Sequence, residues 1–93
     1  MRYSICIINW NWLEILKLSL QALKTDVNVY DMEVLIVDNG SVDGSGDWLK
    51  TQVYPWLTSI CNTDNVGSAV GRNQMIRQAK GDYILMLDSD ICI

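Results

Sequence analysis

The sequence contains no histidine and no long apolar run. Without histidine, zinc sites that combine histidine with cysteine at the usual spacings are excluded. The apolar stretch that precedes Asn9 is far shorter than the core of a signal peptide or a membrane span. We therefore expect a cytoplasmic protein, and membrane association remains open only for a longer parent chain.

Basic residues are few and scattered along the chain. Seven lysines and arginines stand against eleven aspartates and glutamates, which gives a formal net charge of −4. No stripe of positive charge emerges that would follow a nucleic-acid backbone or an anionic bilayer. Nucleic acid is therefore not expected as a partner, and an anionic ligand would need backbone NH groups, one or two arginines or a bound cation.

The three cysteines, Cys6, Cys61 and Cys92, are odd in number and stand in apolar runs. This pattern favours buried free thiols in a reducing compartment over disulfides or metal ligands. Hydrophobic residues make up 49% of the 93 residues and charged residues 19%, a balance typical of one folded domain with buried strands. We therefore expect a single domain over residues 1–93.

Four short apolar runs, each followed by a polar turn, predict strands. Continuous rather than alternating hydrophobicity indicates strands that are buried on both faces, as in a parallel sheet covered by helices. The runs are residues 5–8, 34–37, 57–61 and 83–87.

The segments between these runs have the periodicity of helices. Leucines at three- and four-residue spacing predict a first helix over 13–23, with Asn11 as its N-cap. A second helix is expected from Val42 or Asp43 to a point just before Pro55, since proline disfavours helical geometry in the preceding residue. The third is expected from about 67 to 79, with Gly81 supplying a left-handed residue at its end.

The order of strands and helices predicts an α/β fold, with a parallel sheet of about four strands and three crossover helices on both faces. In such sheets, ligands bind outside the carboxyl ends of the strands, where the strand order reverses. The polar residues that follow the four apolar runs all fall at this edge.

Asp88, Ser89 and Asp90 follow the last predicted strand. Two carboxylates two residues apart can approach one hard cation if the chain turns there, and oxygen ligands favour Mg²⁺ or Mn²⁺. A metal with open positions would bridge to a diphosphate. The alternative is a solvated acidic turn without a ligand.

Asp38 follows the second predicted strand, where a carboxylate can accept hydrogen bonds from a nucleobase NH or from ribose hydroxyls. The same segment also suits a purely structural role, in which Asp38 shapes the loop and Ser41 or Asp43 caps the next helix. The two interpretations are compatible.

The segment from Asn65 to Asn73 opens the third predicted helix with small residues that allow close approach of a ligand. Helix-end NH groups attract phosphate, and Arg72 is placed to reach a phosphate or a base. The spacing matches neither a P-loop nor a dinucleotide fingerprint, and Arg72 also suits an ordinary surface position. Trp10 is the best candidate for carbohydrate stacking among four tryptophans that otherwise suit a core.

Taken together, the ordered motifs resemble the amino-terminal half of the family 2 glycosyltransferases, which have the GT-A fold. The motifs are Asn9-Trp10-Asn11, Asp38-Asn39-Gly40-Ser41-Val42-Asp43, Asn65-Val66-Gly67, Arg72-Asn73, Ala79-Lys80-Gly81-Asp82-Tyr83 and Asp88-Ser89-Asp90. The resemblance spans essentially the whole chain and implies a Rossmann-like, nucleotide-sugar-binding half of that fold.

The resemblance implies roles for individual residues. Nucleotide-sugar binding falls to Asn9, Asn11, Asp38, Asn65, Gly67, Arg72 and Asp88, with Asp38 at the nucleobase. Asp88 and Asp90 would hold Mn²⁺ or Mg²⁺, with Asp90 as the main ligand. The cation would offset the charge of the departing nucleoside diphosphate while an acceptor hydroxyl of unknown identity attacks the anomeric carbon.

The sequence departs from the family pattern at Asn9, Trp10 and Gln74, the last standing where a small residue is common. The catalytic base and the acceptor site of the family belong to a second half, so the base is expected beyond Ile93. We interpret the chain as a fragment of a longer enzyme that does not transfer sugar alone.

Two other classes of function remain open at this point. One is a non-catalytic α/β interaction module that forms a homo-oligomer through an exposed strand edge. The other is a phosphohydrolase-like enzyme with the first aspartate of Asp-x-Asp as nucleophile. The second is disfavoured because that motif usually opens such a domain, whereas here it stands at residues 88–90.

Overall fold

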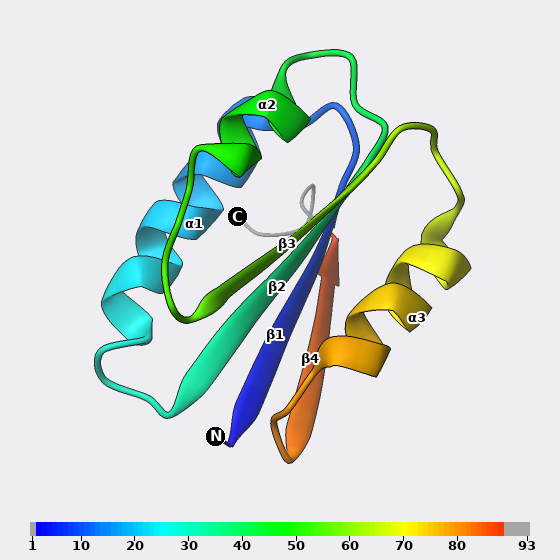
Figure 1. Ribbon diagram of the computed structural model, residues 1–93. Coiled ribbons are helices and arrows are strands. Elements are labelled where there is room, and N and C mark those ends of the chain that lie inside the picture. The colour runs from blue at the N-terminus through cyan, green and yellow to red at the C-terminus, as the bar shows by residue number, and fades with distance from the viewer. Residues whose placement is uncertain (1, 89–93) are drawn as a thin grey trace.

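The computed structural model describes residues 2–88, which form four strands and three helices in alternation (Figure 1). In chain order the elements are β1 (Tyr3–Asn9), α1 (Leu13–Asp26), β2 (Met32–Asn39), α2 (Ser45–Lys50), β3 (Leu57–Asn62), α3 (Ser68–Gln78) and β4 (Tyr83–Asp88).

The strands form one parallel sheet in the order β3-β2-β1-β4. The direction of strand addition reverses between β1 and β4, because the chain builds outward to β3 and then crosses back to the other side of β1. Asn9 pairs with Asp38, Asn39 with Asn62, and Ile8 with Asp88, so all four strands end at one edge. This is the edge where ligands bind in open α/β sheets.

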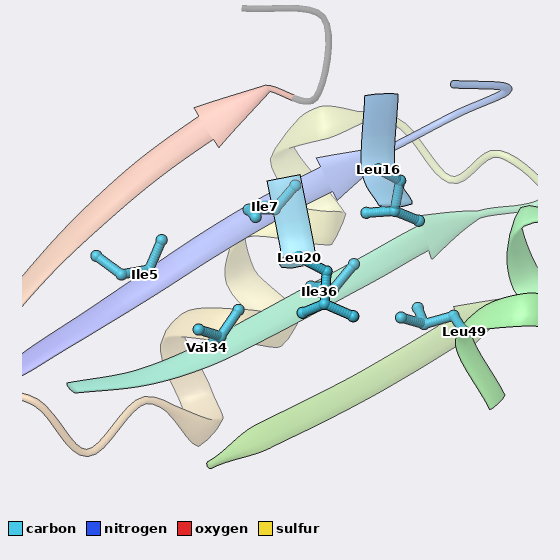
Figure 2. Packing of buried hydrophobic residues seen from close by; sticks show 7 residues of the cluster. All are labelled: Ile5, Ile7, Leu16, Leu20, Val34, Ile36 and Leu49. Carbon is cyan, nitrogen blue, oxygen red and sulfur yellow. The ribbon is translucent and has the colours of Figure 1, made fainter. Parts of the chain in front are cut away.

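Helices cover both faces of the sheet, as the sequence predicts (Figure 1). Alternate residues of a strand point to opposite faces, which divides the core in two. The cluster under α1 and α2 consists of Ile5, Ile7, Leu16, Leu20, Val34, Ile36 and Leu49 (Figure 2). The smaller cluster under α3 consists of Cys6, Leu35, Val37 and Met75. The predicted α/β fold with crossover helices is thereby confirmed.

The prediction that all four strands are buried on both faces holds for β1 and β2 and is wrong for β3 and β4. The two outer strands have a neighbour on one side only, and the helices pack mainly over the centre of the sheet. On β4, the side chain of Leu85 is 51% exposed although its partner on β1, Ile5, is buried.

The start of α1 differs from the prediction that Asn11 caps it. Asn11 has a φ of 56°, in the left-handed region, and Trp12 occupies the cap position without a side-chain cap. The free NH of Leu13 instead donates to Asp43 Oδ2 at 3.0 Å. A carboxylate from the β2–α2 loop thus accepts a hydrogen bond from the first turn of α1, in place of a capping side chain next to the helix.

The ends of α2 and α3 also differ from the predictions. α2 begins after Gly44, which has a φ of 92°, and ends at Lys50, well short of Pro55. α3 ends at Gln78, and the next residue, Ala79, is extended, so Gly81 does not supply a left-handed residue. Glycine is needed at 81 for space, because a Cβ there would lie 2.6 Å from Ser4 Oγ.

The amino edge of the sheet holds a buried carboxylate that the sequence patterns do not indicate. Glu33 is 5% exposed, and its Oε2 accepts hydrogen bonds from Ser4 Oγ at 2.7 Å and from the NH of Lys80 at 2.6 Å. These bonds fasten the start of β4 to β1 and β2 and so help to set the level at which β4 ends.

Candidate functional site

Asp38 is the centre of the polar side chains at the carboxyl edge. It is buried, and its Oδ1 accepts hydrogen bonds from Asn9 Nδ2 at 2.9 Å and from Ser41 Oγ at 2.6 Å. Its Oδ2 accepts one bond, from the NH of Ser41 at 3.2 Å. The carboxylate is thus fixed by its own loop and by the end of β1, while Oδ2 keeps capacity for another donor.

Asn11 joins the β1–α1 loop to the β2–α2 loop. Its NH donates to Ser41 Oγ at 2.9 Å, and its Oδ1 accepts from the NH of Val42 at 2.8 Å. The left-handed conformation of Asn11 allows both bonds. Asn9 therefore contacts Asp38 directly, and Asn11 shapes the loop that holds Ser41 against Asp38.

A cleft of about 300 Å³ opens beside Asp38, between the β2–α2 loop, α2 and the end of β3. The cleft lies at the lower end of the range of small-molecule sites. Asp47 and Lys50 of α2 and Thr63 after β3 line it together with Asp38. The cleft therefore offers polar and charged groups of both signs around one buried carboxylate.

The floor of this cleft is tightly packed. A Cβ at Gly46 would lie 3.0 Å from Asp38 Oδ2, so glycine lets α2 approach the carboxylate closely. Cys61 of β3 lies beside Gly46, with its Sγ 3.8 Å from the carbonyl oxygen of Gly46. Burial and the nearby charge of Asp38 raise the pKa of the Cys61 thiol, which keeps it protonated near neutral pH.

The β3–α3 loop packs against the β2–α2 loop and carries two of the predicted residues. A Cβ at Gly40 would lie 2.6 Å from the backbone carbon of Asp64, so the two loops are in backbone contact there. The NH of Gly67 donates to Asn65 Oδ1 at 2.8 Å, which folds the loop into a turn before α3. Asn65 and Gly67 thus shape this loop.

Three side-chain amides connect the ends of β2 and β3 to α3. Asn62 and Gln74 exchange two hydrogen bonds, of 2.9 and 3.0 Å. Asn62 Nδ2 also donates to Asn39 Oδ1 at 3.0 Å, and Asn39 Nδ2 donates to the carbonyl oxygen of Gly67 at 3.2 Å. Sequence reasoning missed this network, and its only signal was the unusual glutamine at position 74.

The remaining predicted residues are less closely gathered. Arg72 is exposed on α3, which lies on the other face of the sheet from α2 (Figure 1). The main chain of Asp88 pairs with Ile8, one residue before Asn9, at the same edge. Asp90 lies outside the described residues. The structure therefore brings Asn9, Asn11 and Asp38 together, and no hydrogen bond or ion pair within residues 2–88 links Arg72 to them.

The tryptophans divide into two pairs. Trp48 and Trp56 pack against the core cluster under α1 and α2. Trp10 and Trp12, at the carboxyl edge, are 51% and 48% exposed. Trp10 therefore remains a candidate for stacking on a ligand, since an exposed ring at the ligand edge is available for contact.

Neither a metal cluster nor a membrane span occurs within residues 2–88. No three histidine, cysteine, aspartate or glutamate side chains of this part gather closely enough to hold a metal ion. None of the described helices is long and apolar enough to cross a membrane.

The sequence of the chain matches the model of the family "Glycosyl transferase family 2" over residues 4–93. The chain therefore belongs to this family, as the ordered motifs predict. An uncharacterized glycosyltransferase of Bacillus subtilis (strain 168), YfnE, is 36% identical over 93 residues, which cover 98% of this chain. The chain spans 24% of the length of that relative.

Solved glycosyltransferase structures share the fold. The mannosyltransferase PcManGT from Pyrobaculum calidifontis, in complex with GDP-Man and Mn²⁺, superposes with a TM-score of 0.79 at 24% identity, over 96% of this chain and 27% of that one. Residues 1–349 of S. aureus TarS in complex with UDP-GlcNAc give a TM-score of 0.77 at 26% identity, over 97% of this chain and 27% of that one. The expected GT-A type of α/β fold is thereby confirmed.

Proposed function

We propose that this chain is the donor-binding part of a metal-dependent glycosyltransferase, which moves a sugar from a nucleoside diphosphate to an acceptor hydroxyl. The observation that carries the proposal is the buried carboxylate of Asp38, held beside a cleft at the ligand edge of the sheet. Membership of glycosyl transferase family 2 supports the reaction class.

The polar atoms around Asp38 favour a nucleobase that donates NH groups. Asp38 Oδ2 has capacity for another hydrogen bond, and Asn9 Oδ1 is buried without a partner among the described residues. A buried acceptor without a donor is costly, so a ligand NH at this point would be stabilising. Uracil and guanine carry such groups, in line with the UDP-GlcNAc and GDP-Man complexes of the two structural neighbours.

We assign the cation to Asp88 and Asp90, whose carboxylates are suited to Mn²⁺ or Mg²⁺. The main chain of Asp88 ends β4 beside the end of β1, which brings this strand end to the edge where Asp38 lies. The bound cation would offset negative charge on the diphosphate. Asn65, Gly67 and Arg72 would border the diphosphate from the α3 side, where helix NH groups face the ligand edge.

Sugar transfer also needs a general base and an acceptor site. The first relative is about four times as long as this chain, since the chain spans 24% of it. We propose that the general base and the acceptor site correspond to the part of such relatives that residues 1–93 do not match. We therefore expect residues 1–93 alone to bind the donor without transferring sugar. A cytoplasmic location is proposed with this function.

A non-catalytic interaction module is not favoured as an alternative, because the family model covers residues 4–93 and the motifs at Asn9, Asn11 and Asp38 converge. Pairing between two copies along β4 stays compatible with donor binding.

Titration calorimetry with UDP and GDP sugars, with and without Mn²⁺, tests the proposal. We expect binding of at least one donor, strengthened by Mn²⁺ and weakened about tenfold or more by Asp90→Ala. Failure of both this chain and a longer parent to bind any donor would sink the donor-binding function. Binding that ignores both Mn²⁺ and Asp90→Ala would instead remove the metal from the proposal.

A further inference from the structure

We propose that Gln74 is a positioning residue for nucleotide binding. It holds the β3–α3 loop in place through the side chains of Asn62, at the end of β3, and Asn39, at the end of β2. The inference rests on the proposed donor site, because it concerns the wall of the cleft beside Asp38. Gln74 itself is on α3 and is not expected to touch the nucleotide.

The amide network connects Gln74 to the start of α3 through the ends of β3 and β2. Gln74 Nε2 donates to Asn62 Oδ1, Asn62 Nδ2 donates to Asn39 Oδ1, and Asn39 Nδ2 donates to the carbonyl oxygen of Gly67. An amide side chain has one oxygen and one NH₂ group, so each bond fixes the orientation of the next amide. The carbonyl oxygen of Gly67 can only accept, so it sets the orientation of Asn39 and, through Asn39 Oδ1, that of Asn62. Gln74 matches this orientation with a second bond, in which its Oε1 accepts from Asn62 Nδ2.

The end of the network is the start of α3. The carbonyl oxygen of Gly67 accepts the bond from Asn39 and also the first helical bond, from the NH of Gly71 at 3.2 Å. Gly67 has a φ of 87°, which other residues rarely adopt. The network therefore stabilises a backbone conformation that has little local preference of its own.

This loop forms part of the surroundings of Asp38. Asn62 lines the cleft, and the backbone at Asp64 is in contact with Gly40, next to the Ser41 that binds Asp38. A shift of the β3–α3 loop would therefore alter the cleft wall and the loop that orients the carboxylate.

The test compares Gln74→Leu with Gln78→Leu, which changes an exposed glutamine on the same helix. In Gln74→Leu, Asn62 Oδ1 loses its donor, so we expect UDP or GDP, whichever the unmodified chain binds, to bind about tenfold more weakly in the presence of Mn²⁺. Gln78→Leu should bind as the unmodified chain does. Circular dichroism at the binding temperature checks that both variants are folded.

A second measurement separates this inference from the proposed function. In NMR spectra, the side-chain NH₂ resonances of Asn39 and Asn62 should move in Gln74→Leu, and the NH of Gly71 should exchange with solvent about tenfold faster. Unchanged resonances and exchange would overturn the positioning role, whatever the nucleotide does. Equal nucleotide affinity in Gln74→Leu would overturn its link to binding. If the unmodified chain binds neither nucleotide, the donor-site proposal fails for this chain and the link to binding falls with it.

Discussion

Asn9 and Asp38 occupy paired positions at the ends of β1 and β2, and Asn9 Nδ2 donates to Asp38 Oδ1 at 2.9 Å. Both side chains are almost inaccessible to solvent. Asn9 Oδ1 has no partner among the described residues and Asp38 Oδ2 has only one, so this buried pair has two acceptors with unused capacity for hydrogen bonds. The polar groups of this pair are more consistent with a ligand site than with a structural turn alone.

The first prediction concerns Asp38→Asn. An asparagine keeps the shape of the side chain but places an NH₂ group where one acceptor oxygen stands, so a nucleobase NH would meet a donor. We expect nucleotide affinity to fall about tenfold to hundredfold, as measured by calorimetry. Asp26→Asn, an exposed change at the end of α1, is the matched control and should leave affinity unchanged. Undiminished binding by a folded Asp38→Asn variant would contradict the assignment of Asp38 to the nucleobase.

The second prediction concerns the contact between the two loops at Gly40. Gly40→Ala combines a left-handed φ of 73° with a Cβ placed 2.6 Å from the backbone of Asp64. We expect a loss of about 3 kcal/mol in the free energy of unfolding, from backbone strain and overpacking together. Gly44→Ala is a control for the backbone strain alone. Gly44 has a φ of 92°, but a Cβ there would lie 3.9 Å from its nearest neighbour, Leu13 Cδ2. Urea denaturation should give a loss near 1 kcal/mol for the control, and equal losses would show that the loops are not in tight contact.

The fold and the centre of the site could be predicted from the sequence because their signals are local. Four apolar runs, each ending in polar residues, specify parallel strands and place Asn9, Asp38 and Asp88 at one edge. The details that sequence reasoning missed depend on contacts between distant residues. Asp43 binds the NH of Leu13, 30 residues away, and Glu33 binds the NH of Lys80, 47 residues away.

The same reason explains the errors at particular residues. Asn11 has the side chain of a helix cap, and a tertiary bond between its Oδ1 and the NH of Val42 takes that side chain away from the helix. Gly81 resembles a helix terminator, whereas its role is to leave room for Ser4.

The third prediction is a dependence of stability on pH through Asp43. Partial burial opposes ionisation of this carboxyl, but hydrogen bonds from the Ser45 side chain and from the NH groups of Ser45 and Leu13 outweigh it and hold the pKa of Asp43 below its ordinary value. A lowered pKa in the folded state contributes stability above the unfolded value of 3.8, and this contribution is lost as the pH falls through the folded value.

Asp43→Ala should therefore lower the free energy of unfolding by about 1 kcal/mol near pH 6, as for the loss of a helix cap. The difference from the unmodified protein should shrink as the pH falls below the unfolded value of 3.8, because Asp43 then gains a proton in the unfolded chain before it gains one in the folded protein. Thermal unfolding between pH 3 and 7 measures the difference, and Asp26→Ala serves as an exposed control. A difference that is constant across this range would show that the charge of Asp43 does not matter.

The fourth prediction concerns the thiol of Cys6, which is fully buried in the cluster under α3. Burial, with a smaller effect from the negative charge of Glu33, raises the pKa of Cys6 to about 11. Only the thiolate reacts with iodoacetamide, so at pH 8 the thiolate fraction of Cys6 should be about a hundredfold below that of an ordinary cysteine, even before burial hinders access. Peptide mass spectrometry after timed alkylation should therefore find Cys6 unmodified in the native protein and modified in urea. Glu33→Gln removes the nearby charge without exposing the thiol, so native Cys6 should stay protected from alkylation in this variant. Rapid labelling of Cys6 in the native, unmodified protein would contradict the prediction and would mean that α3 opens readily from the sheet.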